Sequence, residues 1–200
     1  MEEPALSLIE DFLGSSLVFA SAIRRVIEQG ALREAVGEEL TESQLKLLKL
    51  LSLSDTHSLN EVAAFLGISS AAASKAVDKL VNRMLLRRTE GEADRRAIHL
   101  SVTEPARQLL AAYDSALRRK LQQILGGFSE EELTGATEIL NRFTGRIVGN
   151  SSQSPEICLQ CGMYFPARCL IREQLGRTCD YLSRRAGRQT AEAPAVAARE

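Results

Sequence analysis

The sequence has little net charge, because 25 lysine and arginine residues nearly balance 26 aspartate and glutamate residues. A net charge of −1 argues against a protein that coats nucleic acid with its whole surface, although it permits a local basic patch. No apolar run approaches the roughly 20 residues that span a bilayer, and the Met1-Glu2-Glu3 start is unlike a secretory signal peptide. We therefore expect a cytoplasmic protein with no membrane partner.

Common catalytic signatures are also missing. The sequence contains no phosphate-binding loop, no dinucleotide fingerprint and no serine-hydrolase arrangement. It has only two histidines, His57 and His99, and neither has a cysteine or carboxylate nearby at metal-ligand spacing. The sequence therefore predicts that the protein is not an enzyme.

Long amphipathic helices are predicted at both ends of the main domain. Apolar residues recur every three or four positions over residues 6–29, with no charge between Asp11 and Arg24. Two further helices are predicted over residues 105–147, separated by the Gly126-Gly127 pair. Because these apolar stripes exceed what a small domain core can cover, we expect the two regions to form the interface of a homodimer.

Two capping boxes mark helix starts in the middle of the sequence. Thr41 with Gln44, and Ser58 with Glu61, have the spacing at which side chains at positions N-cap and N3 satisfy each other's backbone amides. The second of these helices ends at Gly67, a residue suited to a left-handed cap.

A third helix follows after a tight turn, and Ser69 or Ser70 can cap it. Two helices joined by such a turn form a helix-turn-helix, whose second helix recognises DNA in many proteins. The buried face predicted for this helix consists of Ala73, Val77, Leu80, Val81 and Met84.

A two-stranded hairpin is predicted directly after the helix-turn-helix. Ile98, Leu100 and Val102 alternate with small or polar residues, so one face of the second strand is apolar. A lone hairpin is not stable in water, and we expect this face to rest on the helical core as the wing of a winged helix. The charged tip around Gly91 carries the arginines, which are Arg87, Arg88, Arg95 and Arg96. The predicted fold is therefore mainly α, a winged helix-turn-helix flanked by long dimerisation helices, over residues 1–149.

Basic residues are concentrated on the hairpin and the helix before it. Residues 70–100 hold seven lysines and arginines against four acidic residues, whereas residues 1–60 hold five against ten. Arginines can engage phosphate oxygens or enter the minor groove while the recognition helix lies in the major groove. The alternatives are that the arginines form an ordinary solvated charge run and that the serines only cap the helix. The candidate DNA-binding residues are Ser69, Ser70, Ala71, Ser74, Lys75, Lys79, Arg83, Asp94, Arg95 and Arg96.

Roles differ within this set. We expect Ser74 and Lys75 to reach DNA, and Lys79 and Arg83 to contact the DNA backbone rather than the bases. Asp94 is expected to hold the wing tip in shape rather than to touch DNA.

The stretches SLNEVAAFLGISSAAASKAVDKLVNRMLLRR and DRRAIHLSVTEPARQLL resemble the multiple-antibiotic-resistance regulator (MarR) family. The resemblance covers about residues 5–148 and implies a homodimer that binds a near-palindromic operator in double-stranded DNA and is often released by a small-molecule effector. The family's wing aspartate, and the arginine two positions later, correspond to Asp94 and Arg96. One departure is Met84, which stands where many members have glycine and implies a different cap there.

All four cysteines lie close together, outside the region that resembles the family. Their spacing is C-x2-C-x7-C-x9-C, and such clustering in a reducing compartment favours metal binding or redox chemistry over a disulfide. The first pair with Gly162 forms half of a zinc knuckle, a [4Fe-4S] cluster is the alternative, and redox-active or unligated thiols are the third possibility. The candidate ligands are Cys158, Cys161, Cys169 and Cys179.

The sequence as a whole predicts a DNA-binding transcriptional regulator, with repression as the expected activity. Residues 150–182 form the metal-binding or redox segment, and the polar, alanine-rich residues 183–200 are expected to be a disordered tail. A winged-helix scaffold that binds protein and carries a structural zinc site is the alternative.

Overall fold

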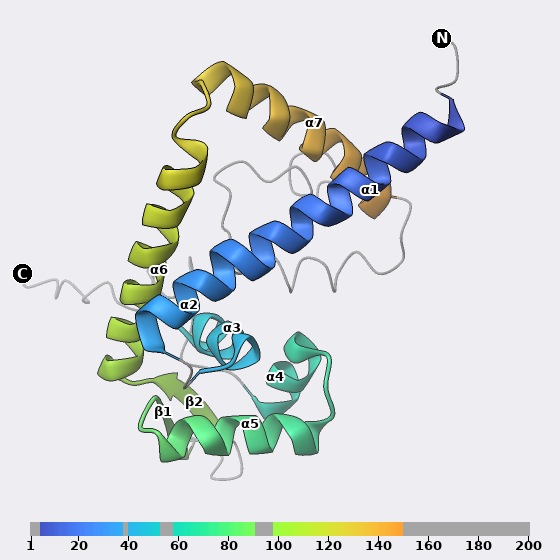
Figure 1. Cartoon of the computed structure of the whole chain (residues 1–200). Helices are drawn as coiled ribbons and strands as arrows, with labels where there is room; N and C mark the ends of the chain where they lie inside the picture. Colours follow the sequence, from blue (N-terminus) through green and yellow to red (C-terminus); the bar gives the residue numbers. More distant parts are fainter. Residues whose placement is uncertain (1–4, 38–39, 53–57, 91–97, 150–200) are drawn as a thin grey trace, which may run out of the picture. The chain divides into compact units, whose positions relative to one another are not determined.

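The computed structural model of the chain describes residues 5–37, 40–52, 58–90 and 98–149 (Figure 1). These residues fall into two compact units. One contains the residues up to 42 together with 111–127, and the other contains 43–110 and the residues from 128 onward. Helix α6, Glu104–Leu125, begins in the second unit and continues in the first.

One continuous helix dominates the first unit. It consists of α1 (Leu6–Ala22), a π-helical stretch η1 (Ile23–Glu28) and α2 (Gln29–Val36). Gly37, with a φ of 68°, ends it. The predicted helix over residues 6–29 is thus confirmed and runs longer than expected.

The apolar character of this helix corrects one expectation. An 18-residue window within Leu6–Val36 has a mean hydropathy of 1.5, and none of that window is buried. By length and composition alone this helix could cross a bilayer, so the expectation that no apolar stretch approaches that length was wrong. The reason is that Glu10 and Asp11 interrupt the apolar run without lowering its mean hydropathy much.

The second unit contains the helix-turn-helix. Its helices are α3 (Glu42–Leu51), α4 (Leu59–Leu66) and α5 (Ser70–Asn82). Helix α3 is buried on more than one face, because Leu47 and Leu50 are buried as well as Leu45, Leu48 and Leu51. The fully buried side chains that these helices supply include Leu45, Leu47, Leu48, Leu51, Val62, Val77 and Leu80.

The wing is an antiparallel pair of strands, β1 (Leu86–Glu90) and β2 (Ile98–Val102), with Leu86 opposite Val102 and Arg88 opposite Leu100. Leu86, Leu100 and Val102 are buried, which confirms that the apolar face of the hairpin covers the core. The sequence had placed Arg87 and Arg88 in the loop at the tip of the hairpin, and this was wrong, because both lie in strand β1.

A capping box begins the last described helix, α7 (Glu130–Gly149). Ser129 Oγ accepts a hydrogen bond from Glu132 N at 3.2 Å, and Glu132 Oε2 accepts one from Ser129 N at 2.7 Å. This reciprocal pair opens α7. Most apolar side chains of α7 are exposed, including Leu133, Ile139, Leu140, Phe143 and Ile147.

Candidate nucleic-acid interface

The turn between α4 and α5 is closed by one glycine and one serine. Gly67 has a φ of 64°, and Ile68 N donates a hydrogen bond of 3.1 Å to Ala63 O, which is the long bond of a Schellman motif. Ser69 then caps α5, since its Oγ accepts from Ala72 N at 3.3 Å. Of the two serines proposed as caps, Ser69 is therefore the one that performs this role.

Ser70 has a different role. Its hydroxyl donates a hydrogen bond of 3.4 Å to Asn60 Oδ1 on α4. This bond ties the first turn of the recognition helix to the preceding helix and so fixes the angle of the helix-turn-helix locally.

Helix α5 has one face in the core and one face open to solvent. Ala73, Val77 and Leu80 are buried, as predicted. Lys75 and Lys79 are exposed, and neither has an ion-pair partner in the part of the chain that the structure describes. They are four residues apart, so they lie about 6 Å apart along the helix axis. This face offers two available cations to a polyanion.

The other predicted residues of α5 surround these lysines. Ala71 is exposed and Ser74 is half-buried, whereas Arg83 is half-buried and forms the C-cap of the helix. Ala71 is the right size for close approach of a ligand to the helix. Nothing in these positions blocks the face that carries the lysines.

Met84 corrects the predicted buried face of α5. The helix ends at Asn82, and the Met84 side chain is 75% exposed with a backbone φ of 57°. Met84 N donates to Val81 O at 2.8 Å, and Leu85 N donates to Leu80 O at 2.9 Å. Met84 therefore occupies the left-handed position at the helix end where glycine is usual, and this position turns its side chain out of the core.

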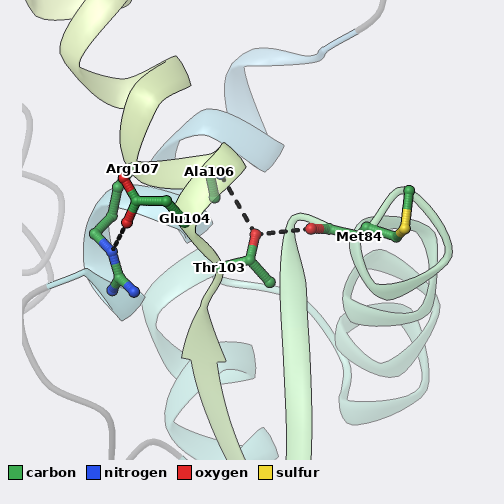
Figure 2. Close-up of polar contacts among 5 residues, drawn as sticks. All are labelled: Met84, Thr103, Glu104, Ala106 and Arg107. Carbon is green, nitrogen blue, oxygen red and sulfur yellow. Dashed lines mark hydrogen bonds and ion pairs between the residues drawn. The ribbon is translucent and has the colours of Figure 1, made fainter.

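A hydrogen-bonded junction closes the base of the wing (Figure 2). The Thr103 hydroxyl donates to Met84 O at 2.7 Å and accepts from Ala106 N at 3.4 Å. The backbone amide of Thr103 also donates to Leu85 O at 3.2 Å. Thr103 thus caps α6, and the same side chain fastens the end of α5 to the start of α6.

An ion pair joins the wing to the recognition helix. Arg88 Nη2 on β1 lies 2.7 Å from Asp78 Oδ1 on α5. Asp78 was not among the residues predicted from the sequence, although it is the only acidic residue in α5 and stands among lysines. That isolation in a basic stretch was the signal that could have identified it.

The remaining candidate residues lie outside the described residues. These are the wing-tip residues Asp94, Arg95 and Arg96, together with the four cysteines. Within the described ranges, no group of three or more histidine, cysteine, aspartate or glutamate residues is arranged to hold a metal ion.

The first unit contains a separate cluster of charges. Glu34 on α2 accepts from Arg119 Nη2 at 2.6 Å and lies 3.1 Å from Lys120 Nζ, both on α6. Hydrogen bonds from Arg119 and Lys120 hold the pKa of Glu34 below its ordinary value. A Cβ at Gly30 would lie 3.3 Å from Lys120 Cε, so glycine lets Lys120 pass close to α2.

A buried tyrosine lies in the same unit. Burial raises the pKa of the Tyr113 phenol well above its ordinary range, and the nearby carboxylates of Glu28, Asp114 and Glu42 raise it further. The phenol therefore stays protonated and neutral at any physiological pH.

Comparison with known proteins identifies this architecture. Residues 40–98, which include the helix-turn-helix and the first strand of the wing, match the model of the MarR family. Residues 40–98 therefore resemble the MarR family. The family prediction made from the sequence is confirmed by this match.

Solved structures extend the similarity to the flanking helices. RV1404 from Mycobacterium tuberculosis is 24% identical with a TM-score of 0.62, over 72% of this chain and 95% of that chain. FabT from Streptococcus pneumoniae, solved in complex with DNA, is 19% identical with a TM-score of 0.58, over 74% and 100%. MepR from S. aureus, solved bound to ethidium bromide, is 22% identical with a TM-score of 0.50, over 66% and 95%. These similarities show that the chain shares the MarR fold.

Proposed function

We propose that the chain is a transcriptional regulator that binds double-stranded DNA with α5 and the wing. The observation that carries the proposal is the open face of α5, where Lys75 and Lys79 have no ion-pair partner among the described residues and stand on a MarR-type winged helix. The structure of FabT in complex with DNA supports this reading of the shared fold. A regulator needs no catalytic group, and the proposed activity is not enzymatic.

The docking geometry follows from the elements. Helix α5 would enter the major groove by its N-terminal half, and the wing tip with Arg95 and Arg96 would reach the adjacent minor groove. In a homodimer, two such helices would read half-sites about 34–36 Å apart, which requires a near-palindromic operator. Occupation of an operator excludes other proteins from it, and repression is the simplest consequence.

The dimer would be formed by the long helices. On α1, Leu13, Leu17 and Phe19 are 50–61% exposed, and α7 adds further exposed apolar side chains. A monomer rarely leaves so much apolar surface in water. We propose that a second copy of this chain covers these side chains.

A membrane is the competing partner for α1. Its apolar window includes Glu10 and Asp11, and a carboxylate inside a spanning helix is unfavourable, by roughly 2.5–3.5 kcal/mol at the helix centre and by less toward its ends. A protein interface can leave both carboxylates at its solvent-exposed rim without this cost. We therefore propose a cytoplasmic protein. Co-flotation of the intact chain with lipid vesicles would contradict this.

A small-molecule effector is also proposed. The structure of MepR bound to ethidium bromide shows that one protein of this fold accepts an aromatic cation. An effector that favours a DNA-incompetent state of this chain would weaken its DNA affinity in proportion to its preference for that state.

We further propose that Cys158, Cys161, Cys169 and Cys179 bind one metal centre per chain. Four thiolates within 22 residues of one another can satisfy a tetrahedral zinc ion or a [4Fe-4S] cluster. Zinc predicts a colourless protein with one equivalent of metal, whereas the cluster predicts a brown protein that bleaches in air. Elemental analysis of the anaerobically purified chain distinguishes zinc from iron. Four freely titratable thiols in a metal-free folded protein would refute the proposal.

Salt-dependent binding tests the proposed function. The intact chain should bind a duplex of its operator with an affinity that falls steeply as salt rises, and Arg96→Ala should weaken binding by more than roughly 1 kcal/mol. Arg118→Ala is the matched control, because Arg118 is an exposed arginine of α6 and belongs to the other compact unit than the wing. A chain that binds protein partners but shows no salt-dependent DNA affinity would support the scaffold alternative.

A further inference from the structure

We propose that Asp78 determines specificity by holding Arg88 away from DNA, an inference that rests on the proposed DNA binding. Asp78 lies in α5 three residues after Lys75 and directly before Lys79, so it belongs to the surface that would face a duplex. A bare carboxylate at this place would repel phosphate. DNA binding by this surface therefore requires a cation that neutralises Asp78.

The Arg88 side chain is directed toward α5. In strand β1 successive side chains point to opposite faces, and Arg88 shares its face with the buried Leu86. Its guanidinium reaches Asp78 Oδ1 at 2.7 Å, with side-chain exposures of 35% for Arg88 and 48% for Asp78. The neighbouring Arg87 is exposed on the opposite face and has no ion-pair partner among the described residues.

This ion pair has two consequences for DNA binding. It neutralises Asp78 within a cationic surface, and it withholds Arg88 from phosphate oxygens, which any sequence would offer. It also links the recognition helix to the first wing strand, the two elements whose separation sets how major-groove and minor-groove contacts are made together. Asp78 thus lowers affinity for DNA of any sequence while it preserves the geometry that an operator requires.

Removal of the carboxylate should therefore make binding tighter and less selective. Asp78→Asn frees one arginine per protomer, hence two per bound dimer, so the slope of log affinity against log salt should steepen by about 1.8. Between about 50 and 200 mM salt, this slope change makes the gain in affinity for a mixed-sequence duplex about 12-fold larger at the lower concentration. The ratio of operator to mixed-sequence affinity should fall.

The experiment compares two duplexes by fluorescence anisotropy at several salt concentrations. One is the duplex that the unmodified chain selects from a random-sequence pool, and the other is a mixed-sequence duplex of the same length. Arg88→Gln is the second variant, and it should weaken binding to both duplexes because it leaves Asp78 uncompensated. The exchange of both residues, Asp78→Arg with Arg88→Asp, should restore part of the selectivity.

Glu104→Gln is the matched control. Glu104 pairs with Arg107 at 3.0 Å within α6, so this change also removes one carboxylate and frees one arginine. Its salt slope should equal that of the unmodified chain. If Asp78→Asn keeps the original slope and selectivity while the unmodified chain binds its operator, the role of Asp78 is wrong and the proposed function stands. If the unmodified chain binds neither duplex, the proposed function itself fails.

Discussion

Helices α3 and α1 are both rich in leucine, yet they have opposite environments. In α3, Leu45, Leu47, Leu48, Leu50 and Leu51 are all buried. In α1 no residue is buried, although α1 is the more apolar of the two. Hydropathy alone therefore does not decide burial, because the described residues cover the leucines of α3 and leave those of α1 exposed. Helix α1 has the composition of a core helix and needs a second molecule to become one.

The largest effect on stability is expected for a substitution in the buried helix α3. Leu48→Ala should lower the free energy of unfolding by about 2–5 kcal/mol, because it removes a fully buried side chain and leaves a cavity. Chemical denaturation at two protein concentrations should give the same loss at both. A loss that depends on protein concentration would show that α3, like α1, relies on a partner.

Leu17→Pro should affect the exposed helix α1 instead of the buried helix α3. Proline inside α1 costs the helix about 3 kcal/mol, and we expect loss of dimerisation and of DNA binding together. Leu17→Ala is the control that keeps the helix and should weaken the dimer less. Sedimentation velocity would contradict the prediction if the proline variant kept the mass and DNA affinity of the unmodified chain.

Thr103→Val should show that polar contacts also close the winged helix internally. The change keeps the shape but removes the hydrogen bonds to Met84 O and from Ala106 N, for a loss of about 1–2 kcal/mol in unfolding free energy. Thr103→Ser keeps the hydroxyl and should retain most of this unfolding free energy. Equal stability of the valine variant and the unmodified chain would mean that the junction contributes nothing.

Met84→Gly should stabilise the same unit by about 0.5–1 kcal/mol, since glycine adopts a positive φ without the steric cost that methionine carries. Gly67→Ala is the matched change at the end of α4, where the φ is 64°, and it should have the opposite sign. Thermal unfolding of both variants measures the difference. A destabilised Met84→Gly would show that the exposed methionine contributes contacts of its own.

The smallest effect concerns the first unit. Because the pKa of Glu34 lies below 4.5 in the folded chain, its ion pairs with Arg119 and Lys120 stabilise the protein above that pH and are lost as the pH falls through the folded value. Glu34→Gln should therefore flatten the acid limb of unfolding free energy against pH. Identical acid limbs for the two proteins would contradict this.

Local signals in the sequence predicted most of the fold. The capping box at Ser129 and Glu132 forms the reciprocal hydrogen bonds that its spacing indicates, and the alternation in Leu100 and Val102 gives a buried strand face. The error at Met84 arose because helical periodicity continues past the helix end, and periodicity cannot show that the backbone turns left-handed there.

Contacts between distant residues were beyond the reach of such signals. Glu34 and Arg119 are 85 residues apart, and the pairing of Asp78 with Arg88 depends on how β1 packs against α5. Neither pair has a spacing rule that a single sequence could reveal. The same limit explains why neither Asp78 nor Arg88 was among the DNA-binding residues predicted from the sequence.

In the proposed assembly, two copies of this chain cover each other's exposed apolar helices and thereby place two winged helices on one duplex. Sedimentation equilibrium of the intact chain, alone and with its selected operator duplex at moderate salt, measures both stoichiometries. We expect a dimer in the free protein and two chains per duplex in the complex. A monomer at micromolar concentration that binds the duplex as a single chain would contradict this assembly.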